Sequence, residues 1–383
     1  MKKVLFVFGT RPEAIKLAPV INKLKVRRQE FQLIVCVTAQ HREMLDNVLD
    51  LFEIEPDYDL NIMENNQSLF DVTVKGLRRL EKVLKKEKPD IVLVQGDTTT
   101  TLVASLTTYY LKIKTGHIEA GLRTEDRFNP FPEEINRKLT DCLADFYFAP
   151  TEKAKENLIK EGVDERKIFV TGNTVVDALL MTVEKQKDKR IQERFERKFL
   201  SNYGVSFNNQ KFILVTGHRR ESFGKDLESI CQGLRKLAHS NHNLQIIYPV
   251  HLNPHVQKPV RKILKKVSNI HLIEPLDYSS FVWLMNRAHL ILTDSGGIQE
   301  EAPSLGKPVL VMRKKTERPE GISAGTAKLV GTESEIIFSE TMELLDDGKS
   351  YKAMSKAVNP YGDGKASERI IDILRNKLLR VND

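Results

Sequence analysis

Three acidic residues in the first part of the chain stand where a strand ends or a helix begins. Asp97 follows an apolar run through a glycine turn, Glu119 follows a strand-like segment directly, and Glu133 opens a helical stretch. Carboxylates presented at such ends can donate and accept protons as general acids and bases. Two of them also allow a purely structural interpretation. Asp97 could cap a helix, and Glu133 could form an ion pair with Arg137, four residues further on.

A histidine in the second half of the chain has a similar setting. His218 lies after a glycine at the end of an apolar run and is followed by two arginines, Arg219 and Arg220. An isolated histidine carries little information, but a histidine at a strand end beside two cations favours a functional site. Such a cationic neighbourhood could stabilise a departing diphosphate.

The segment 293–313 predicts a phosphate-binding turn. An apolar run leads into Ser295, Gly296 and Gly297, which open a short helical stretch that carries Glu301. Backbone N–H groups at such a helix start point toward one spot and can hold a phosphate. Glu300 also lies on this stretch, and an acid just inside the helix stands where it could bind the hydroxyls of a ribose.

Basic residues at other strand ends are further candidates for anion binding. Arg11 and Lys16 follow the first strand and could both face a diphosphate, and Arg318 lies in a later loop. Thr10 and Glu13 around the same first turn also fit an ordinary helix cap. That cap does not involve the side chain of Arg11, so both interpretations can hold together.

The elements that must position these residues alternate regularly between strand and helix. This alternation predicts parallel sheets covered by helices on both faces, an α/β fold. It occurs in two successive series, so we expect two doubly wound, Rossmann-like domains. The expected strands are 3–8, 31–37, 91–94, 114–118, 146–149 and 168–170 in the first series, and 212–215, 244–249, 270–273, 290–293 and 309–312 in the second.

The division between the two domains is predicted at residue 172. The first domain takes residues 1–172 and the second takes 173–363. A highly charged stretch, 184–197, is expected to be helical. The tail from 364 to 383 contains an amphipathic helix, which should return to the first domain because its apolar face needs a partner.

Composition restricts the classes of partner. The chain has 383 residues, 40% of them hydrophobic, and a formal net charge of +8. The lysines alternate with glutamates on helical segments, and no aromatic residues are interleaved with basic ones, so nucleic acid is not expected as a partner. No apolar stretch is long enough to span a membrane, and because the first strand starts at Lys3 we expect no signal peptide. A basic protein also suits an anionic small substrate.

Metal and cofactor sites are not expected either. The three cysteines, Cys36, Cys142 and Cys231, have no metal or redox spacing, which fits reduced thiols in a cytoplasmic protein. The histidines form no convincing zinc pattern. Neither domain opens with G-x-G-x-x-G after its first strand, which disfavours a dinucleotide cofactor.

Taken together, these motifs resemble those of the non-hydrolysing UDP-N-acetylglucosamine 2-epimerases. The match runs in order from Phe8 to about Gly331. The resemblance implies a GT-B-like fold with the active site in the cleft between the domains, and reversible conversion of UDP-N-acetylglucosamine to UDP-N-acetylmannosamine. It rests on seven segments: 8–16 (FGTRPEAIK), 95–100 (QGDTTT), 117–124 (HIEAGLRT), 132–137 (PEEINR), 171–174 (TGNT), 217–221 (GHRRE) and 294–306 (DSGGIQEEAPSLG).

The resemblance also implies roles for individual residues. Asp97, Glu119 and Glu133 match the acid/base carboxylates of the family, and His218 matches its essential histidine. Arg137 is counted among the substrate-binding residues. Phe281 falls where the family holds the uracil, and Leu276 occupies a position where relatives often have Gln. The positions that match UDP contacts are Arg11, Lys16, Ser295, Gly296, Gly297, Glu301 and Arg318.

Some bacterial relatives bind a second UDP-N-acetylglucosamine as an activator near the segment 38–44. Gln40, His41 and Arg42 are present there and are candidate allosteric residues. Glu43 and Asn66 differ from at least one such relative, which has Gln and Arg. The resemblance further suggests a homodimer whose product feeds a surface polysaccharide.

Inversion at C2 of the sugar can follow two routes. A nicotinamide could oxidise C3 and acidify the C2 proton, but the absent dinucleotide fingerprint argues against this route. The family resemblance implies the other route, in which anti elimination of UDP gives a glycal and syn addition follows. We expect the domains to close on the substrate, because this intermediate must not escape to water.

Three rival functions stay open at this point. A GT-B glycosyltransferase using a UDP-sugar would share the cradle and the fold but would need an acceptor. A hydrolysing 2-epimerase would release UDP and free N-acetylmannosamine. A related enzyme could act on a diacetamido uronic acid, although the sequence of residues 9–16 favours the simpler sugar.

Overall fold

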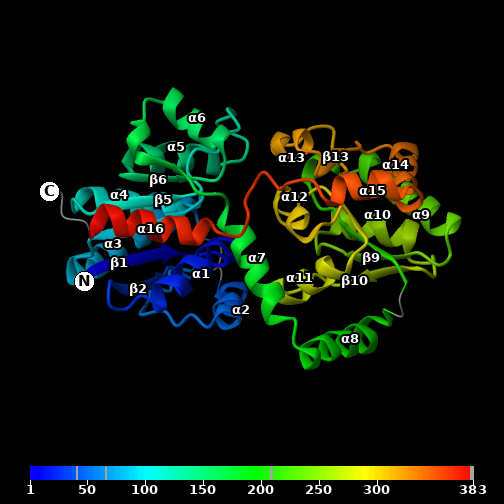
Figure 1. Ribbon diagram of the computed structural model, residues 1–383, viewed down its shortest axis with the longest axis horizontal. Coiled ribbons are helices and arrows are strands. Elements are labelled where there is room, and N and C mark those ends of the chain that lie inside the picture. Colours follow the sequence, from blue (N-terminus) through cyan, green and yellow to red (C-terminus); the bar gives the residue numbers. More distant parts are fainter. Residues whose placement is uncertain (40–41, 65–66, 208–209, 380–383) are drawn as a thin grey trace. The chain divides into compact units, whose positions relative to one another are not determined.

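The computed structural model describes residues 1–39, 42–64, 67–207 and 210–379, which divide into two compact units. Unit 1 contains Met1–Ala178 and the chain from Tyr361 onward, and unit 2 contains Leu179–Pro360. The chain passes from unit 1 to unit 2 inside helix α7 (Thr174–Lys185), between Ala178 and Leu179. This point lies six residues beyond the boundary predicted at residue 172. Each unit carries one parallel sheet with helices on its two faces (Figure 1).

Unit 1 is built on a seven-stranded sheet in the order β3-β2-β1-β4-β5-β6-β7, and every pairing is parallel. The strands are β1 (Lys2–Phe8), β2 (Phe31–Val37), β3 (Tyr58–Asp59), β4 (Ile91–Gln95), β5 (Lys114–Ile118), β6 (Phe146–Ala149) and β7 (Ile168–Val170). Its helices, besides the start of α7, are α1 (Arg11–Lys25), α2 (Arg42–Phe52), α3 (Leu69–Glu87), α4 (Thr99–Tyr110), α5 (Glu133–Leu143), α6 (Glu152–Lys160), the 3₁₀ turn η1 (Glu165–Lys167) and α16 (Ala366–Leu378).

Unit 2 repeats the plan with six parallel strands in the order β10-β9-β8-β11-β12-β13. They are β8 (Phe212–Thr216), β9 (Gln245–Pro249), β10 (Ile270–Ile273), β11 (Leu290–Thr293), β12 (Val309–Val311) and β13 (Ala327–Leu329). Its helices, besides the end of α7, are α8 (Lys189–Tyr203), η2 (Arg220–Ser222), α9 (Lys225–Ser240), α10 (Pro254–Leu264), α11 (Tyr278–Arg287), α12 (Gly296–Glu301), η3 (Ala302–Leu305), α13 (Pro319–Ser323), α14 (Ser334–Asp346) and α15 (Gly348–Ser355).

Both sheets have the strand order of doubly wound dinucleotide-binding folds, 3-2-1-4-5-6, to which unit 1 adds a seventh strand. The expected α/β class with two Rossmann-like domains is therefore confirmed. In such sheets the order reverses beside the first strand, so a crevice opens outside the carboxyl ends of the strands there. This point lies between β1 and β4 in unit 1, and between β8 and β11 in unit 2.

The central strands are apolar because helices cover them on both sides. In β1 the run Val4–Phe8 is fully buried, as the continuous hydrophobic pattern of a parallel strand requires. The C-terminal helix α16 packs on α1 and buries Ile370, Ile371 and Leu374. No helix in the described part of the chain is long and apolar enough to cross a membrane.

The charged stretch predicted as one helix is divided in two. Helix α7 ends at Lys185 and α8 begins at Lys189, with Asp188 as its N-cap. The side chain of Asp188 accepts a hydrogen bond from the backbone N of Arg190 at 2.8 Å. A short polar side chain that binds the backbone in this way starts a new helix rather than continuing the old one.

Candidate active site

Asp97 lies at the switch point of unit 1, in the turn that follows β4. The turn needs Gly96, whose φ of +73° is unfavourable for other residues, and its N–H donates to the carbonyl of Ile118 in β5 at 3.0 Å. The side-chain amide of Asn136 donates to the carbonyl of Asp97 at 2.9 Å. The turn is therefore held from the neighbouring strand and from α5.

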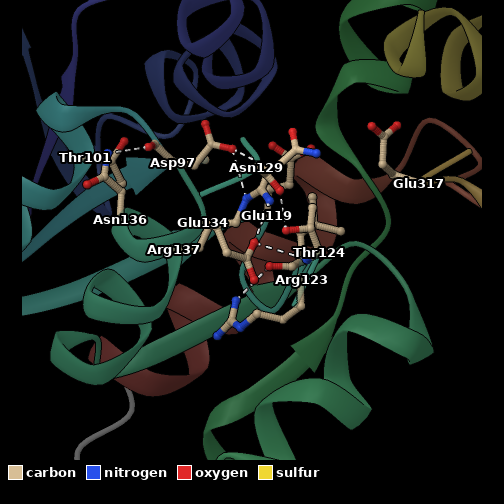
Figure 2. Close-up of polar contacts among 12 residues, drawn as sticks. Asp97, Thr101, Glu119, Arg123, Thr124, Asn129, Glu134, Asn136, Arg137 and Glu317 are labelled. Carbon is tan, nitrogen blue, oxygen red and sulfur yellow. Dashed lines mark hydrogen bonds and ion pairs between the residues drawn. The ribbon is translucent and has the colours of Figure 1, made fainter. Parts of the chain in front are cut away.

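The carboxylate of Asp97 is bound by Arg137 rather than by a helix N-terminus. The Nη2 and Nε atoms of Arg137 lie 2.7 and 3.0 Å from one carboxylate oxygen (Figure 2). The N-cap of α4 is Thr98, whose hydroxyl accepts from the N–H of Thr101 at 3.2 Å. The interpretation of Asp97 as a cap was therefore wrong. The side chain of Asp97 keeps 29% of its surface exposed, so it remains accessible to a ligand.

Glu119 directly follows β5, and polar side chains from three elements of unit 1 hold its carboxylate, among other contacts. Its backbone adopts φ +70°, and its residue surface is 8% exposed. The Nζ of Lys16 lies 2.7 and 2.6 Å from the two carboxylate oxygens. The amide of Asn173 donates to one oxygen at 2.9 Å, and the amide of Gln95 donates to the other. The structure thus brings two predicted site residues, Lys16 and Glu119, into direct contact.

Glu133 and Glu134 begin α5 together but have different surroundings. The Oε2 atom of Glu133 is buried and has no hydrogen-bond partner among the described residues. Glu134 is fully buried, and its two oxygens accept from the N–H groups of Thr124 and Glu125, both at 3.1 Å. Arg137 also donates to Glu134, at 3.0 Å, so the ion pair expected between Glu133 and Arg137 is replaced by one with the next glutamate (Figure 2).

A buried ionic network behind these carboxylates was not predicted from the sequence. His117 is completely buried in β5, with Nδ1 2.6 Å from Asp141 and Nε2 2.8 Å from the carbonyl of Gly96. The other oxygen of Asp141 accepts from the N–H of Gly121 at 3.2 Å and from Arg123 at 2.7 Å. This network ties the loops that carry Asp97 and Glu119 to α5.

Charges in the network decide the protonation state of Asp141. Burial alone would raise the pKa of this carboxyl, but His117 and Arg123 together lower it below its usual value. The carbonyl of Gly96 can only accept, and an ionised Asp141 can only accept. His117 therefore bridges Asp141 through Nδ1 and the turn after β4 through Nε2.

Around Arg11, the first helix of unit 1 begins with a buried glutamate that has a structural role. Glu13 accepts from the N–H groups of Gly9 and Thr10 at 3.0 and 2.8 Å. It also accepts from the hydroxyl of Thr98 at 2.6 Å, so it ties the turns after β1 and β4 together. Burial raises the pKa of Glu13, and these hydrogen bonds oppose that effect. Arg11 starts α1 at this edge and is half-buried.

His218 lies at the switch point of unit 2, directly after β8. The backbone N–H groups of His218 and Arg219 donate to one oxygen of Asp294 at 2.7 and 2.8 Å, which joins the turns after β8 and β11. The ring stacks on His251 with centroids 5.5 Å apart and planes 13° apart, and 43% of the side chain is exposed.

The surroundings of His218 favour its neutral form. Partial burial is the main cause that lowers its pKa, the charges of His251 and Arg219 act in the same direction, and Asp294 opposes them. A neutral imidazole near neutral pH can both donate and accept a proton.

Two arginines flank the predicted phosphate turn. Ser295 is the N-cap of α12, and a Cβ placed on Gly296 would lie 3.7 Å from Arg219 and 3.8 Å from Arg318. Arg318 also bonds Glu300. Because Gly296 has no side chain, an anion could reach the backbone N–H groups of this turn between the guanidinium groups of Arg219 and Arg318.

A third arginine completes this cationic cluster. Arg313 donates to Glu317 at 2.7 Å, and Arg219 lies 3.8 Å from the same carboxylate. Burial would raise the pKa of Glu317, but the hydrogen bond from Arg313 and the charges of both arginines lower it to about 2. Glu317 is thus an anion that already occupies part of the cluster.

The residues predicted to bind the ribose and the uracil also lie in unit 2. Glu301 is 7% exposed and accepts from the hydroxyl of Tyr278 at 3.2 Å. Leu276 and Phe281 are partly buried and pack on the core of unit 2. The candidate allosteric residues Gln40 and His41, and the side chain of Arg42, lie outside the described residues. Among the described residues, no group of three His, Cys, Asp or Glu side chains could hold a metal.

Several proteins that are similar to this chain over nearly its whole length bear the same name. The family model described as UDP-N-acetylglucosamine 2-epimerase matches residues 23–375. A UDP-N-acetylglucosamine 2-epimerase of Salmonella typhimurium is 56% identical over 375 residues, which are 98% of this chain and 98% of that protein. The protein of the same name from Escherichia coli K12 is 55% identical over 374 residues, again 98% of both.

Solved structures agree with these relatives. The UDP-GlcNAc 2-epimerase of Neisseria meningitidis bound to UDP-GlcNAc has a TM-score of 0.88 and 52% identity, and covers 97% of this chain and 99% of that one. The enzyme of Methanocaldococcus jannaschii in complex with UDP-GlcNAc and UDP has a TM-score of 0.78 and 38% identity, with the same coverage. Because the match spans nearly the whole chain at high identity, this protein belongs to the UDP-N-acetylglucosamine 2-epimerase family.

Proposed function

We propose that this protein is an isomerase that reversibly converts UDP-N-acetylglucosamine to UDP-N-acetylmannosamine by inversion at C2. The observation that carries the proposal is the set of three carboxylates, Asp97, Glu119 and Glu133, at the carboxyl edge of the unit 1 sheet. Relatives of more than 50% identity bear the name of this activity, and the Neisseria structure contains UDP-GlcNAc.

The C2 proton of the sugar is not beside a carbonyl, so it is not acidic enough for direct removal. In the proposed reaction a base takes the C2 proton as the C1–O bond to UDP breaks. The electron pair of the C2–H bond then forms a C1=C2 double bond, and UDP leaves with the pair of the C1–O bond. A proton then enters C2 from the opposite face while UDP bonds to C1 again. The atoms balance without an oxidant, and the steps need proton carriers on two faces of the ring.

The carboxylates of unit 1 have the properties that these proton transfers need. Glu133 has a buried oxygen without a hydrogen-bond partner among the described residues, which can receive a proton without first losing a contact. Asp97 and Glu119 are each held in one orientation by a cation, Arg137 and Lys16 respectively. Held carboxylates need little reorganisation when charge develops.

Unit 2 provides the groups for the nucleotide. We propose that the turn from Ser295 to Gly297 and Arg318 bind the diphosphate, because backbone N–H groups and a guanidinium converge there. Glu301 is proposed to bind the ribose and Phe281 the uracil. His218, whose partial burial favours the neutral form, is proposed to act on the departing diphosphate.

Proton NMR of UDP-N-acetylglucosamine with the pure protein in D₂O, without cofactor or acceptor, tests the proposal. We expect a new anomeric signal from UDP-N-acetylmannosamine and deuterium at C2, since a proton taken from C2 is replaced from solvent. Free N-acetylmannosamine with UDP would instead identify a hydrolysing 2-epimerase. An unchanged spectrum would refute the proposal and favour a transferase or another UDP-sugar.

We also propose that the protein is a cytoplasmic homodimer whose product enters a surface polysaccharide. The free thiols include two buried ones, Cys36 and Cys231, which suit a reducing compartment. On α3 the side chains of Phe70 and Val74 are 82% and 58% exposed on one helical face, and a second copy could cover them. Light scattering would measure the mass, and Phe70→Glu should yield the monomer if this face is the interface.

A further inference from the structure

The segment 171–174 has no role in the proposed chemistry, yet it contributes a contact to Glu119. The Nδ2 atom of Asn173 donates to one oxygen of Glu119 at 2.9 Å. Asn173 itself is 3% exposed. A buried amide aimed at the carboxylate of a proposed acid/base residue is in a position to control both its orientation and its proton affinity.

The orientation of the Asn173 amide is fixed by its other atom. Its Oδ1 accepts from the N–H of Val175 at 3.0 Å, at the start of α7. A carboxamide whose oxygen accepts this bond must turn its NH₂ group the other way, toward Glu119. The backbone is fixed as well, since the N–H of Asn173 donates to the carbonyl of Tyr361 at 2.7 Å.

The donors of Glu119 come from three parts of unit 1. Lys16 projects from α1, Gln95 ends β4, and Asn173 precedes α7. Lys16 brings the charge and has a flexible stem, whereas the two amides are neutral donors with fixed geometry. The two amides hold Glu119 independently of whether Lys16 also engages an anionic ligand.

From this geometry we propose that Asn173 is a positioning residue for Glu119. Its NH₂ group keeps the carboxylate aimed at the sugar and stabilises the anionic form of Glu119 relative to the protonated form. The inference rests on the proposed epimerase function and deepens it, because it assigns a task to a residue that does not itself touch the reacting atoms.

The competing explanation is that Asn173 only caps α7. Two substitutions separate the explanations, because the two atoms of the amide have different tasks. Asn173→Ser keeps an oxygen that can accept from the helix N–H but removes the donor to Glu119. Asn173→Asp also keeps the cap oxygen and replaces the donor with a negative charge. Asp188→Ala is the matched control, since it removes a cap of the same i to i+2 kind from α8.

Turnover is measured by NMR as a function of pH for the full-length variants. For Asn173→Ser we expect kcat to fall by roughly 10- to 100-fold with KM within about twofold. The limb of the pH profile set by Glu119 should move up by roughly one pH unit, since loss of a donor raises the proton affinity of a carboxylate whether it serves as base or acid. Asn173→Asp should be more severe, and Asp188→Ala should keep wild-type kinetics.

A wild-type kcat and an unmoved pH limb in Asn173→Ser would overturn the inference. So would a loss of activity that follows a lower melting temperature while the pH limb stays in place, because that result identifies a cap alone. If wild-type protein does not epimerise, the proposed function fails and this inference fails with it. If the wild type epimerises and the Asn173 variants keep wild-type kinetics as Asp188→Ala does, this inference fails while the proposed function stands.

Discussion

Glu133 and Glu134 are neighbours in the chain, and the same substitution should have opposite consequences at the two positions. Replacement of either glutamate by glutamine changes one oxygen to NH₂ and removes a charge, with almost no change in volume. Glu133 has a buried oxygen without a described partner, whereas both oxygens of Glu134 are occupied. The pair therefore separates catalysis from stability within one turn of α5.

The expected magnitudes follow from these contacts. Glu133→Gln removes a proton carrier. General acid–base catalysis typically contributes ~10²- to 10⁴-fold to the rate, so we expect kcat to fall by that factor, which corresponds to an activation barrier higher by about 3 to 5 kcal/mol. Its fold should be unchanged. In Glu134→Gln one of the two backbone N–H groups, at 3.1 Å, must face an NH₂ group, and the ion pair with Arg137 is lost.

Hydrogen bonds to charged groups contribute about 1.5–3 kcal/mol each, so Glu134→Gln should destabilise unit 1 by about 3 kcal/mol. For a unit of this size that is a fall in melting temperature of roughly 6–12 °C. Calorimetry measures the melting temperature, and NMR at a temperature where both variants are folded measures the turnover of UDP-N-acetylglucosamine.

The reasoning would be refuted by either of two results. Full turnover in Glu133→Gln would remove this residue from the proposed chemistry. An unchanged melting temperature in Glu134→Gln would mean that its three donors do not stabilise the loop as the geometry indicates. Glu133→Gln also serves as the control for a charge change at the start of α5, since both variants lose the same charge near the same helix N-terminus.

Three further predictions concern other parts of the protein. Asp141→Asn should lower stability by about 3–5 kcal/mol in urea unfolding, because it breaks a buried ionic network with His117 and Arg123. The lowered pKa of Asp141 means that wild type loses this stability as pH falls through that pKa, so the variant should show a flatter acid limb of stability. Gly121→Ala should destabilise unit 1 even more in the same assay, since φ is +86° and its Cβ would stand 2.2 Å from a carbonyl oxygen of α6. Arg318→Met should weaken UDP binding by roughly 10- to 100-fold in calorimetric titration, because one charged contact in the cradle is lost, and should leave the melting of unit 1 unchanged.

Much of the fold could be predicted because apolar runs mark buried parallel strands directly. The central strands of both sheets were expected within one or two residues of where they occur. The missed strands, β3 and β13, have two and three residues and are edge strands of their sheets. Such short segments carry too few side chains to show a pattern, and their pairing is decided by the neighbouring strand.

The site was predictable in its positions but not in its contacts. The rule that ligands meet the carboxyl ends of strands located Asp97, Glu119 and His218. It could not give the partner of Arg137, because Asp97 is distant in sequence and only the sheet brings them together. A signal for His117 did exist. A histidine inside a buried central strand must find buried partners, and Asp141 and the carbonyl of Gly96 are those partners.

The acidic residues of unit 1 divide by the number of donors that each receives. Glu13, Glu134 and Asp141 are buried, and each accepts three or more hydrogen bonds, from backbone N–H groups and from side chains. Such saturation offsets the cost of burying a carboxylate, so these residues hold the edge of the sheet in place.

Glu133 shows the opposite arrangement, since one of its oxygens is buried without a described partner. An unpaired buried acceptor destabilises the fold by about 1–3 kcal/mol, and a small change of sequence could remove it. Its presence beside a saturated neighbour is explained if a substrate proton is its partner. The same criterion applies to the acids of this edge that have no proposed proton transfer: removal of Glu13, Glu134 or Asp141 should unfold the site before it slows the reaction, whereas removal of Glu133 should slow the reaction without unfolding.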